Sequence, residues 1–173
     1  LESAVDVEAE WDALKSGVRS AFDGVIEWRE KEGRALKQDM EERLKNLLRM
    51  TAQIEERAPD TIARYRERLK EKIRLLCNGD GLDESRLITE VAIMAERCAF
   101  DEEVVRLKSH ATRFNEYLES KEPVGRKLDF LCQELLRETN TVASKSYDTD
   151  ITHTVVEMKS ELEKIREQAQ NIE

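Results

Sequence analysis

The most constraining feature of this sequence is an apolar stripe in its last segment. Between residues 151 and 172, apolar side chains recur at steps of four and three without a fault, at Ile151, Val155, Met158, Leu162, Ile165, Ala169 and Ile172. This spacing places all of them on one face of a helix, and three successive heptads are typical of a coiled-coil seam. Because such a stripe must be covered by other helices, the sequence predicts a helical bundle.

The rest of the chain favours the same all-α fold class. Apolar residues at helical spacing recur over residues 11–28, 36–54, 62–76 and 104–118. Among 173 residues there are two prolines, six glycines and only 5% aromatic residues, whereas 39% are charged, and this composition is typical of long helices. We therefore predict long antiparallel helical hairpins and a helical bundle with coiled-coil-like seams. Stripes of this length also predict a homo-oligomer, in which a partner chain covers part of the apolar surface.

The prolines and glycines suggest how the chain is divided. Residues 1–58 predict a long N-terminal helical arm, which we expect to end before Pro59 because the residue before a proline avoids the helical region. Residues 59–173 predict the bundle. Within it, the small polar segment CNGDGLDES (77–85) predicts a loop, and Asp101 predicts the cap of the helix that follows.

Composition also narrows the classes of function. The formal net charge of -9 argues against simple electrostatic binding of nucleic acid, although residues 104–127 are locally basic. No run of about 18 apolar residues is present, so we expect no membrane span. The cysteines Cys77, Cys98 and Cys132 are odd in number and lack CxxC spacing, which favours reduced, partly buried thiols in a cytoplasmic protein.

Two helical faces carry the polar groups that could perform chemistry. On the segment 125–145, one side is apolar, and the opposite side carries Arg126, Asp129, Gln133, Arg137, Asn140 and Ser144, flanked by Glu134, Glu138 and Lys145. The preceding helix lines up Glu103, Arg106, His110 and Arg113, with Glu102 beside them. If the two helices form an antiparallel hairpin that turns near residues 121–123, the two faces meet in one groove.

The residues alone leave three interpretations of this groove open. In the first, it is a polar network that fixes the register between helices. In the second, arginines and lysines hold a phosphate backbone, carboxylates hold a divalent cation, and His110 or a metal-bound water supplies acid–base chemistry. In the third, the face docks a helix of another protein. The sequence has no HExxH, Walker or GxSxG motif to decide between them.

Several motifs, however, resemble a known family. The segments EEVVRLKSH, VGRKLDFLCQE, RETNTVASKS and ELEKIREQAQNIE resemble the C-terminal half of the bacterial YicC/YloC endoribonucleases, and WREKEGRALKQDMEERL and YRERLKEKI resemble its central helical part. The resemblance implies a cytoplasmic, homohexameric enzyme that cleaves single-stranded or hairpin RNA with a divalent cation, Mn²⁺ or Mg²⁺. It also implies that a strand-rich N-terminal region of the family lies outside this chain, which would be the C-terminal helical portion.

The resemblance and the helical geometry together give a set of candidate site residues. We expect Asp129 to be a metal ligand, with Glu134 and Glu103 as further ligands. His110 is the expected general acid or base, with Arg106, Asp129 and Glu134 completing the catalytic group. RNA contacts are expected from Arg126, Lys127, Arg137, Asn140, Ser144 and Lys145. Ala99 stands where the family usually has an aspartate. The alternative is an RNA-binding or oligomerisation module whose catalytic residues lie in the absent N-terminal region.

Overall fold

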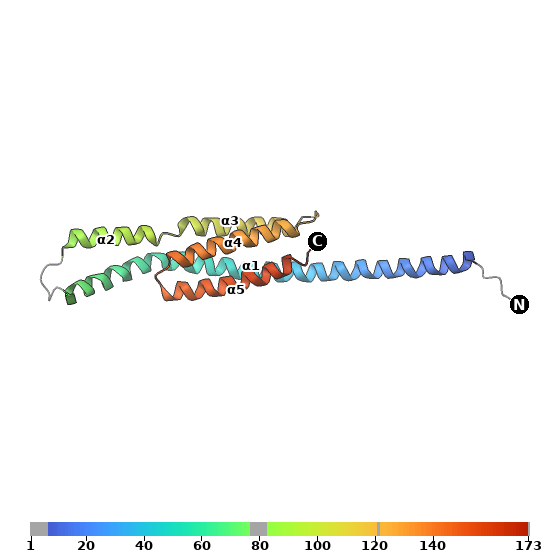
Figure 1. Cartoon of the computed structure of the whole chain (residues 1–173), viewed down its shortest axis with the longest axis horizontal. Helices are drawn as coiled ribbons and strands as arrows, with labels where there is room; N and C mark the ends of the chain where they lie inside the picture. The colour runs from blue at the N-terminus through green and yellow to red at the C-terminus, as the bar shows by residue number, and fades with distance from the viewer. Residues whose placement is uncertain (1–6, 77–82, 121, 173) are drawn as a thin grey trace. The chain divides into compact units, whose positions relative to one another are not determined.

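The computed structural model describes residues 7–76, 83–120 and 122–172, and within these ranges the chain is all-α (Figure 1). This confirms the predicted fold class. Five helices follow one another along the described residues, namely α1 (Val7–Leu76), α2 (Glu84–Arg97), α3 (Asp101–Leu118), α4 (Gly125–Lys145) and α5 (Thr149–Ala169). Most of the loop predicted at 77–85 lies outside the described residues, as does Cys77.

Helix α1 continues through Pro59, so the predicted helix end at this proline is wrong. A proline inside a helix removes a backbone donor and crowds the preceding turn, at a cost of about 3 kcal/mol. Buried residues on both sides of the proline offset that cost, because Ile54 is 1% exposed and Thr61 is 6% exposed. Tertiary packing therefore overrides the local preference for a break.

The chain divides into two compact units, Leu1–Asp39 and Met40–Glu173. In the first unit, the described part of α1 presents large apolar side chains to solvent, each 49–65% exposed: Trp11, Leu14, Val18, Phe22, Val25, Ile26 and Trp28. The helical spacing predicted for this segment is thus present, but the described residues of the first unit do not cover its apolar face.

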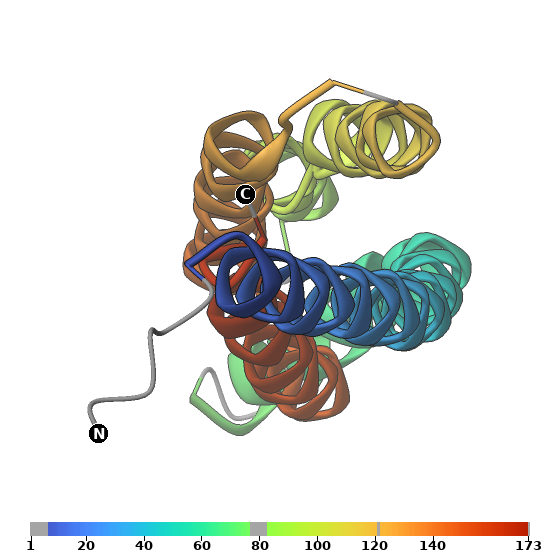
Figure 2. The ribbon, with the colours of Figure 1, turned by 90° about the vertical axis from the view of Figure 1, so that its right-hand side faces the viewer.

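The second unit is a bundle built from antiparallel neighbours. Helix α4 packs against both α3 and α5, and Figure 2 shows these three helices side by side in chain order. The part of α1 that begins at Met40 joins them through ion pairs to α5 and α3. Arg43 lies 3.1 Å from Glu161 of α5, and Glu55 lies 2.6 Å from Lys108 of α3.

The core of this second unit is formed by the predicted apolar stripes. On α5, the heptad residues Ile151, Val155, Met158, Leu162, Ile165 and Ala169 are all at most 1% exposed. Helix α4 buries Leu128, Leu131, Cys132, Leu135 and Val142 against its neighbours. Burial raises the pKa of the Cys132 thiol to about 12 and also raises that of Cys98, and both cysteines are free, as predicted. These thiols are packing groups rather than nucleophiles.

The helix starts show one further correction. Asp101 is the first residue of α3 and not its cap, because the cap position is held by Phe100, which makes no side-chain hydrogen bond there. The Phe100 side chain is 2% exposed, and its burial fixes the path of the chain at this point. Side-chain caps are instead found at Asp83 for α2 and at Asp148 for α5. Among the described helices, none combines the length and the apolar character needed to cross a membrane.

Candidate active site

Helices α3 and α4 pack as an antiparallel hairpin, and this arrangement brings two rows of polar side chains together. On α3 the row is Glu103, Arg106 and His110, and on α4 it is Lys145, Glu138 and Glu134. Both rows step by three, four or seven residues, so each lies along one helical face. The two helices therefore bring polar side chains together, as predicted. On α4, however, the residues that meet α3 are the flanking Glu134, Glu138 and Lys145 and not the centre of the predicted polar face.

The middle of this hairpin holds an imidazole and two carboxylates. One ligand atom from each of His110, Glu134 and Glu138 lies within 4.8 Å of the other two. His110 and Glu134 are half-buried, whereas Glu138 is only 4% exposed. A nearly buried carboxylate needs a compensating charge or ligand, because burial in a protein interior disfavours the charged form.

Arg106 supplies part of that compensation. Its guanidinium lies 3.5 Å from Glu138 and 2.9 Å from Glu102, and these two carboxylates raise the arginine's pKa further above its ordinary value. The Arg106 side chain is still 49% exposed, so one side of the guanidinium faces solvent. The N–H groups on this exposed side of the guanidinium can donate hydrogen bonds to a phosphate oxygen.

A second ion pair closes the end of the hairpin. Lys145 Nζ lies 2.7 Å from Glu103 Oε1 and donates a hydrogen bond of 2.9 Å to the carbonyl oxygen of Ala99. Glu103 is 4% exposed, and its other carboxylate oxygen is buried without a hydrogen-bond partner. Lys145, predicted to contact RNA, is thus held by two groups of its own chain.

Asp129 lies away from this cluster. Its carboxylate is 3.3 Å from Nε of Arg166 on α5 and accepts a hydrogen bond of 2.8 Å from Gln133. On a helix with about 100° per residue, five residues separate Asp129 from Glu134 by about 140°, so the two point to different neighbours. The predicted ligand set of Asp129, Glu134 and Glu103 is therefore not brought together, and only Glu134 belongs to the group of possible ligands.

The remaining predicted RNA contacts lie on the outer surface of α4. Arg137, Asn140 and Ser144 line a shallow hollow of about 490 Å³ together with Gln133, Leu136 and Thr141. Near the start of the helix, Arg126 is exposed, and Lys127 lies 3.5 Å from Glu122 and 5.3 Å from the centre of the Tyr117 ring. These residues form a polar surface beside the cluster around His110, and Arg137 lies 3.9 Å from Glu134 of that cluster.

Sequence reasoning placed Glu138 beside the polar face but assigned it no role. The signal that could have singled it out is its spacing, because Glu134 and Glu138 are one helical turn apart and both face the helix that carries His110. The pairing register of α3 and α4 decides which carboxylates meet the imidazole, and residue patterns on separate helices do not give that register.

Comparison with known proteins is consistent with this architecture. The family described as endoribonuclease YicC-like, C-terminal, matches residues 54–173. A relative from Clostridioides difficile called "Probable endoribonuclease YicC" is 43% identical over 173 residues, covering 99% of this chain and 59% of the relative. A Haemophilus influenzae relative with the same name is 36% identical over 170 residues, covering 96% of this chain and 58% of the relative.

The chain thus spans less than two thirds of the length of these curated relatives. The family match nevertheless includes all of α2, α3, α4 and α5, and therefore the whole hairpin that holds the His110 cluster. On these matches, the chain belongs to the YicC-like endoribonuclease family and contains its C-terminal part.

Proposed function

We propose that this chain carries the active site of a metal-dependent endoribonuclease, which cleaves RNA phosphodiester bonds, and that the site lies in the α3–α4 hairpin. The observation that carries the proposal is the convergence of His110, Glu134 and Glu138. The names of the two relatives support RNA as the substrate. We place the protein in the cytoplasm, where thiols such as the free Cys98 and Cys132 stay reduced.

The residues present fit a divalent cation. One imidazole nitrogen and two carboxylates form a mixed nitrogen and oxygen donor set, and Mn²⁺ accepts both kinds of donor whereas Mg²⁺ prefers oxygen. We therefore assign His110, Glu134 and Glu138 as the ligands and favour Mn²⁺. When bound, the ion would supply Lewis-acid stabilisation of a phosphoryl oxygen. His110 serves as a ligand in this arrangement, which replaces its expected role in proton transfer.

The side chains around the cluster would position the RNA. Arg106 is anchored by Glu102 and Glu138, and its exposed side would hold a phosphate beside the cluster. The exposed hollow on α4 offers hydrogen-bonding groups from Arg137 and Asn140 to the strand. Lys145 would act indirectly, because its ion pair with Glu103 fixes where the two helices meet.

A second candidate function is an RNA-binding or oligomerisation module without chemistry of its own. It is favoured by the ion pairs Arg106–Glu138 and Lys145–Glu103, which would fix the register of the hairpin without any ligand. In that case the catalytic residues lie in the part of the family that this chain does not span. The module would bind RNA but would not cleave it.

The test compares Glu138→Gln with the unchanged chain on a labelled hairpin RNA, in Mn²⁺ or in EDTA. We expect EDTA to abolish cleavage and the substitution to lower the rate by about 10² or more, because one charged ligand is lost. Mn²⁺ binding, followed by electron paramagnetic resonance, should weaken in parallel. Glu116→Gln, an exposed position on the same hairpin, serves as the matched control and should leave both readouts unchanged.

Three results would contradict the proposal. Undiminished cleavage by Glu138→Gln would remove the cluster from the active site. Cleavage that persists in EDTA would exclude the metal requirement. RNA binding without cleavage in the unchanged chain would favour the binding module.

A further inference from the structure

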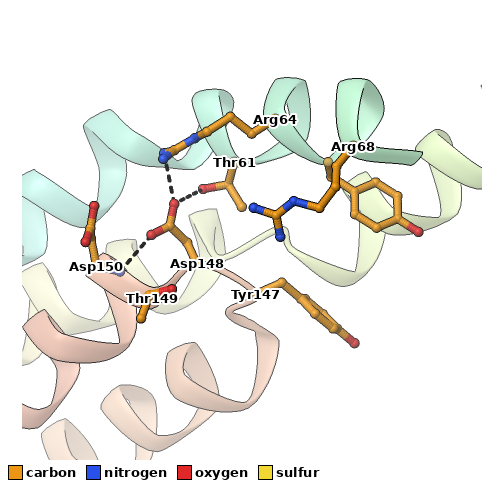
Figure 3. Close-up of a pocket in the computed structure, with 8 residues that line it drawn as sticks. Thr61, Arg64, Arg68, Tyr147, Asp148, Thr149 and Asp150 are labelled. Carbon is orange, nitrogen blue, oxygen red and sulfur yellow. Dashed lines mark hydrogen bonds and ion pairs between the residues drawn. The ribbon is translucent and has the colours of Figure 1, made fainter. Parts of the chain in front are cut away.

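A second cavity lies where the turn between α4 and α5 meets α1, and it is separate from the His110 cluster (Figure 3). Its volume is about 270 Å³. Helix α1 lines it with Thr61, Arg64, Tyr65 and Arg68, and the turn and the start of α5 line it with Tyr147, Asp148, Thr149 and Asp150. None of these residues is used by the proposed cleavage site.

The acidic groups of this cavity are already neutralised. Asp148 lies 2.9 Å from Arg64, accepts a hydrogen bond of 3.2 Å from Thr61 and caps α5 through the backbone N–H of Asp150 at 2.8 Å. Burial opposes the ionisation of Asp148, but the backbone N–H groups of Asp150 and Ile151, the Arg64 guanidinium and the Thr61 hydroxyl lower its pKa. Asp148 is therefore an anion at neutral pH. Asp150 forms an ion pair with Arg57.

Arg68 is the one charge on the wall of the cavity that the described residues leave without an ion-pair partner. The lining holds two arginines and two aspartates, and because Arg57 from outside the lining pairs with Asp150, the Arg68 guanidinium is the charge left available to a ligand. Figure 3 shows the Arg68 side chain reaching from α1 across the cavity. A cation held in this way attracts an anionic group such as phosphate.

The cavity also offers an aromatic surface. Tyr147 lies two residues after the end of α4, lines the same cavity as Arg68 and is 60% exposed, with its ring directed toward solvent (Figure 3). Tyr65 contributes a second ring to the lining. An exposed ring beside an unmatched arginine is the combination on which unpaired nucleobases stack while their phosphate is held.

We propose that this cavity binds a single unpaired nucleotide of RNA, with the base stacked on Tyr147 and the phosphate held by Arg68. The volume of about 270 Å³ is enough for one nucleotide. Tyr147 also follows the helix whose outer face carries the hollow at Arg137, Asn140 and Ser144, so a strand along α4 reaches the cavity at the end of that helix. The inference rests on the proposed function for the choice of RNA over other anionic aromatic ligands.

The test measures the affinity of the 173-residue chain for a labelled single-stranded oligonucleotide and for adenosine 5′-monophosphate. Because stacking on one aromatic side chain is a large part of such binding, Tyr147→Ala should weaken the affinity for the oligonucleotide about 5- to 100-fold, and Tyr147→Phe should restore it. Arg68→Gln should also weaken binding and should reduce the salt dependence by about one phosphate contact.

The matched control for Arg68→Gln lies two residues earlier on the same helix. Arg66 is an exposed arginine of the same helix that does not line the cavity, so Arg66→Gln removes the same charge and should leave the affinity within about twofold. Circular dichroism melting of each variant would show whether a loss of affinity reflects unfolding. A fully paired duplex should bind all variants alike, because it offers no base to the cavity.

The outcomes separate this inference from the proposed function. Binding that depends on Tyr147 and Arg68, with or without cleavage in Mn²⁺, supports the nucleotide site. Wild-type affinity in both variants, in a chain that still cleaves RNA, overturns the nucleotide site alone. Equal competition by inorganic phosphate and adenosine monophosphate, together with no effect of Tyr147→Ala, would reduce the cavity to an anion site and overturn the assignment. No RNA binding at all would overturn both proposals.

Discussion

Asp148 has two structural roles at a single position. It caps α5 by accepting hydrogen bonds from the backbone N–H groups of Asp150 and Ile151, and it joins α5 to α1 through Arg64 and Thr61. Its side chain is 7% exposed, so these partners stand in for water. Because every one of them favours the carboxylate, the contribution of Asp148 to stability must depend on pH.

Asp148→Asn removes the charge and keeps a capping oxygen, whereas Asp148→Ala removes both. We expect Asp148→Ala to lower the free energy of unfolding by about 1 kcal/mol or more through the lost cap, and Asp148→Asn to lower it less. A lowered pKa in the folded state means that the charge stabilises the protein above the ordinary pKa of 3.8 and that this gain is lost as the pH falls through the folded pKa. Urea unfolding at pH 7, 5 and 3 checks this.

The control for this prediction is Asp23→Asn, because Asp23 is an exposed carboxylate that makes no ion pair or side-chain hydrogen bond with the described residues. Its free energy of unfolding should match that of the unchanged chain at each pH. A difference between Asp148→Asn and the unchanged chain that stays constant from pH 7 to pH 3 would show that the carboxylate charge plays no part.

At the level of single residues, sequence patterns identified polar faces but not their partners. Arg106, His110 and Glu134 were assigned to one site, and the structure does bring them close. Asp129 was assigned to the same site but pairs with Arg166 of α5. Each helix can be placed on a wheel from its own sequence, whereas the rotation and register of two packed helices depend on how their cores interlock.

At the level of helices, the start of α4 shows how closely two elements approach. A side-chain carbon added at Gly125 would collide with the backbone carbonyl oxygen of Ile172, just beyond the end of α5, and would come within 3.5 Å of the carbonyl oxygen of Ala169. The first turn of α4 therefore packs directly against backbone. A glycine is required here by space, since no positive φ is involved.

Gly125→Ala is expected to lower the free energy of unfolding by about 1–3 kcal/mol, because an overpacked contact against backbone must be relieved by movement. Gly33→Ala is the matched control, since nothing lies within 4 Å of the added carbon there, and it should stabilise the helix by about 0.5–1 kcal/mol. Urea unfolding curves give both values. Removal of residues 171–173 should rescue Gly125→Ala, and equal effects of the two glycine changes would contradict this account.

The helices themselves could largely be predicted from the sequence. Heptad spacing identified the buried face of α5 correctly, because a regular apolar stripe has one way to avoid water. The errors fall where a local signal competes with packing. Pro59 signals a helix end, yet burial of Ile54 and Thr61 carries α1 past it. Asp101 signals a cap, yet the buried Phe100 occupies that position.

At the level of the whole chain, the first unit has an apolar face that its own residues leave exposed. Trp11, Leu14, Val18, Ala21, Val25 and Trp28 step by three and four along α1, as in a coiled-coil seam. In a two-fold antiparallel pair of such helices, Trp11 would lie opposite Trp28, and Leu14 opposite Val25, since these positions are symmetric about the same point. A second copy of the chain is therefore our expected occupant, in keeping with the predicted homo-oligomer.

Leu14→Glu places a charge within this seam and should shift the chain toward monomer without loss of helix content. Ser16→Glu adds the same charge at a position that points away from the seam and should leave the assembly unchanged. Sedimentation velocity measures the assembly, and circular dichroism measures the helix content. A wild-type chain that sediments as a monomer would show that another segment or partner covers this face, and the predicted homo-oligomer would then be wrong.

The closeness in sequence of the groups around His110 has a consequence for folding. All of them lie on two consecutive helices between residues 103 and 145, joined by a short turn. Contacts between neighbouring helices close small loops and form quickly, whereas the contacts of α1 with α5 join distant parts of the chain. The hairpin can therefore take shape as soon as α4 has emerged from the ribosome, before α5 has emerged to complete the bundle around it.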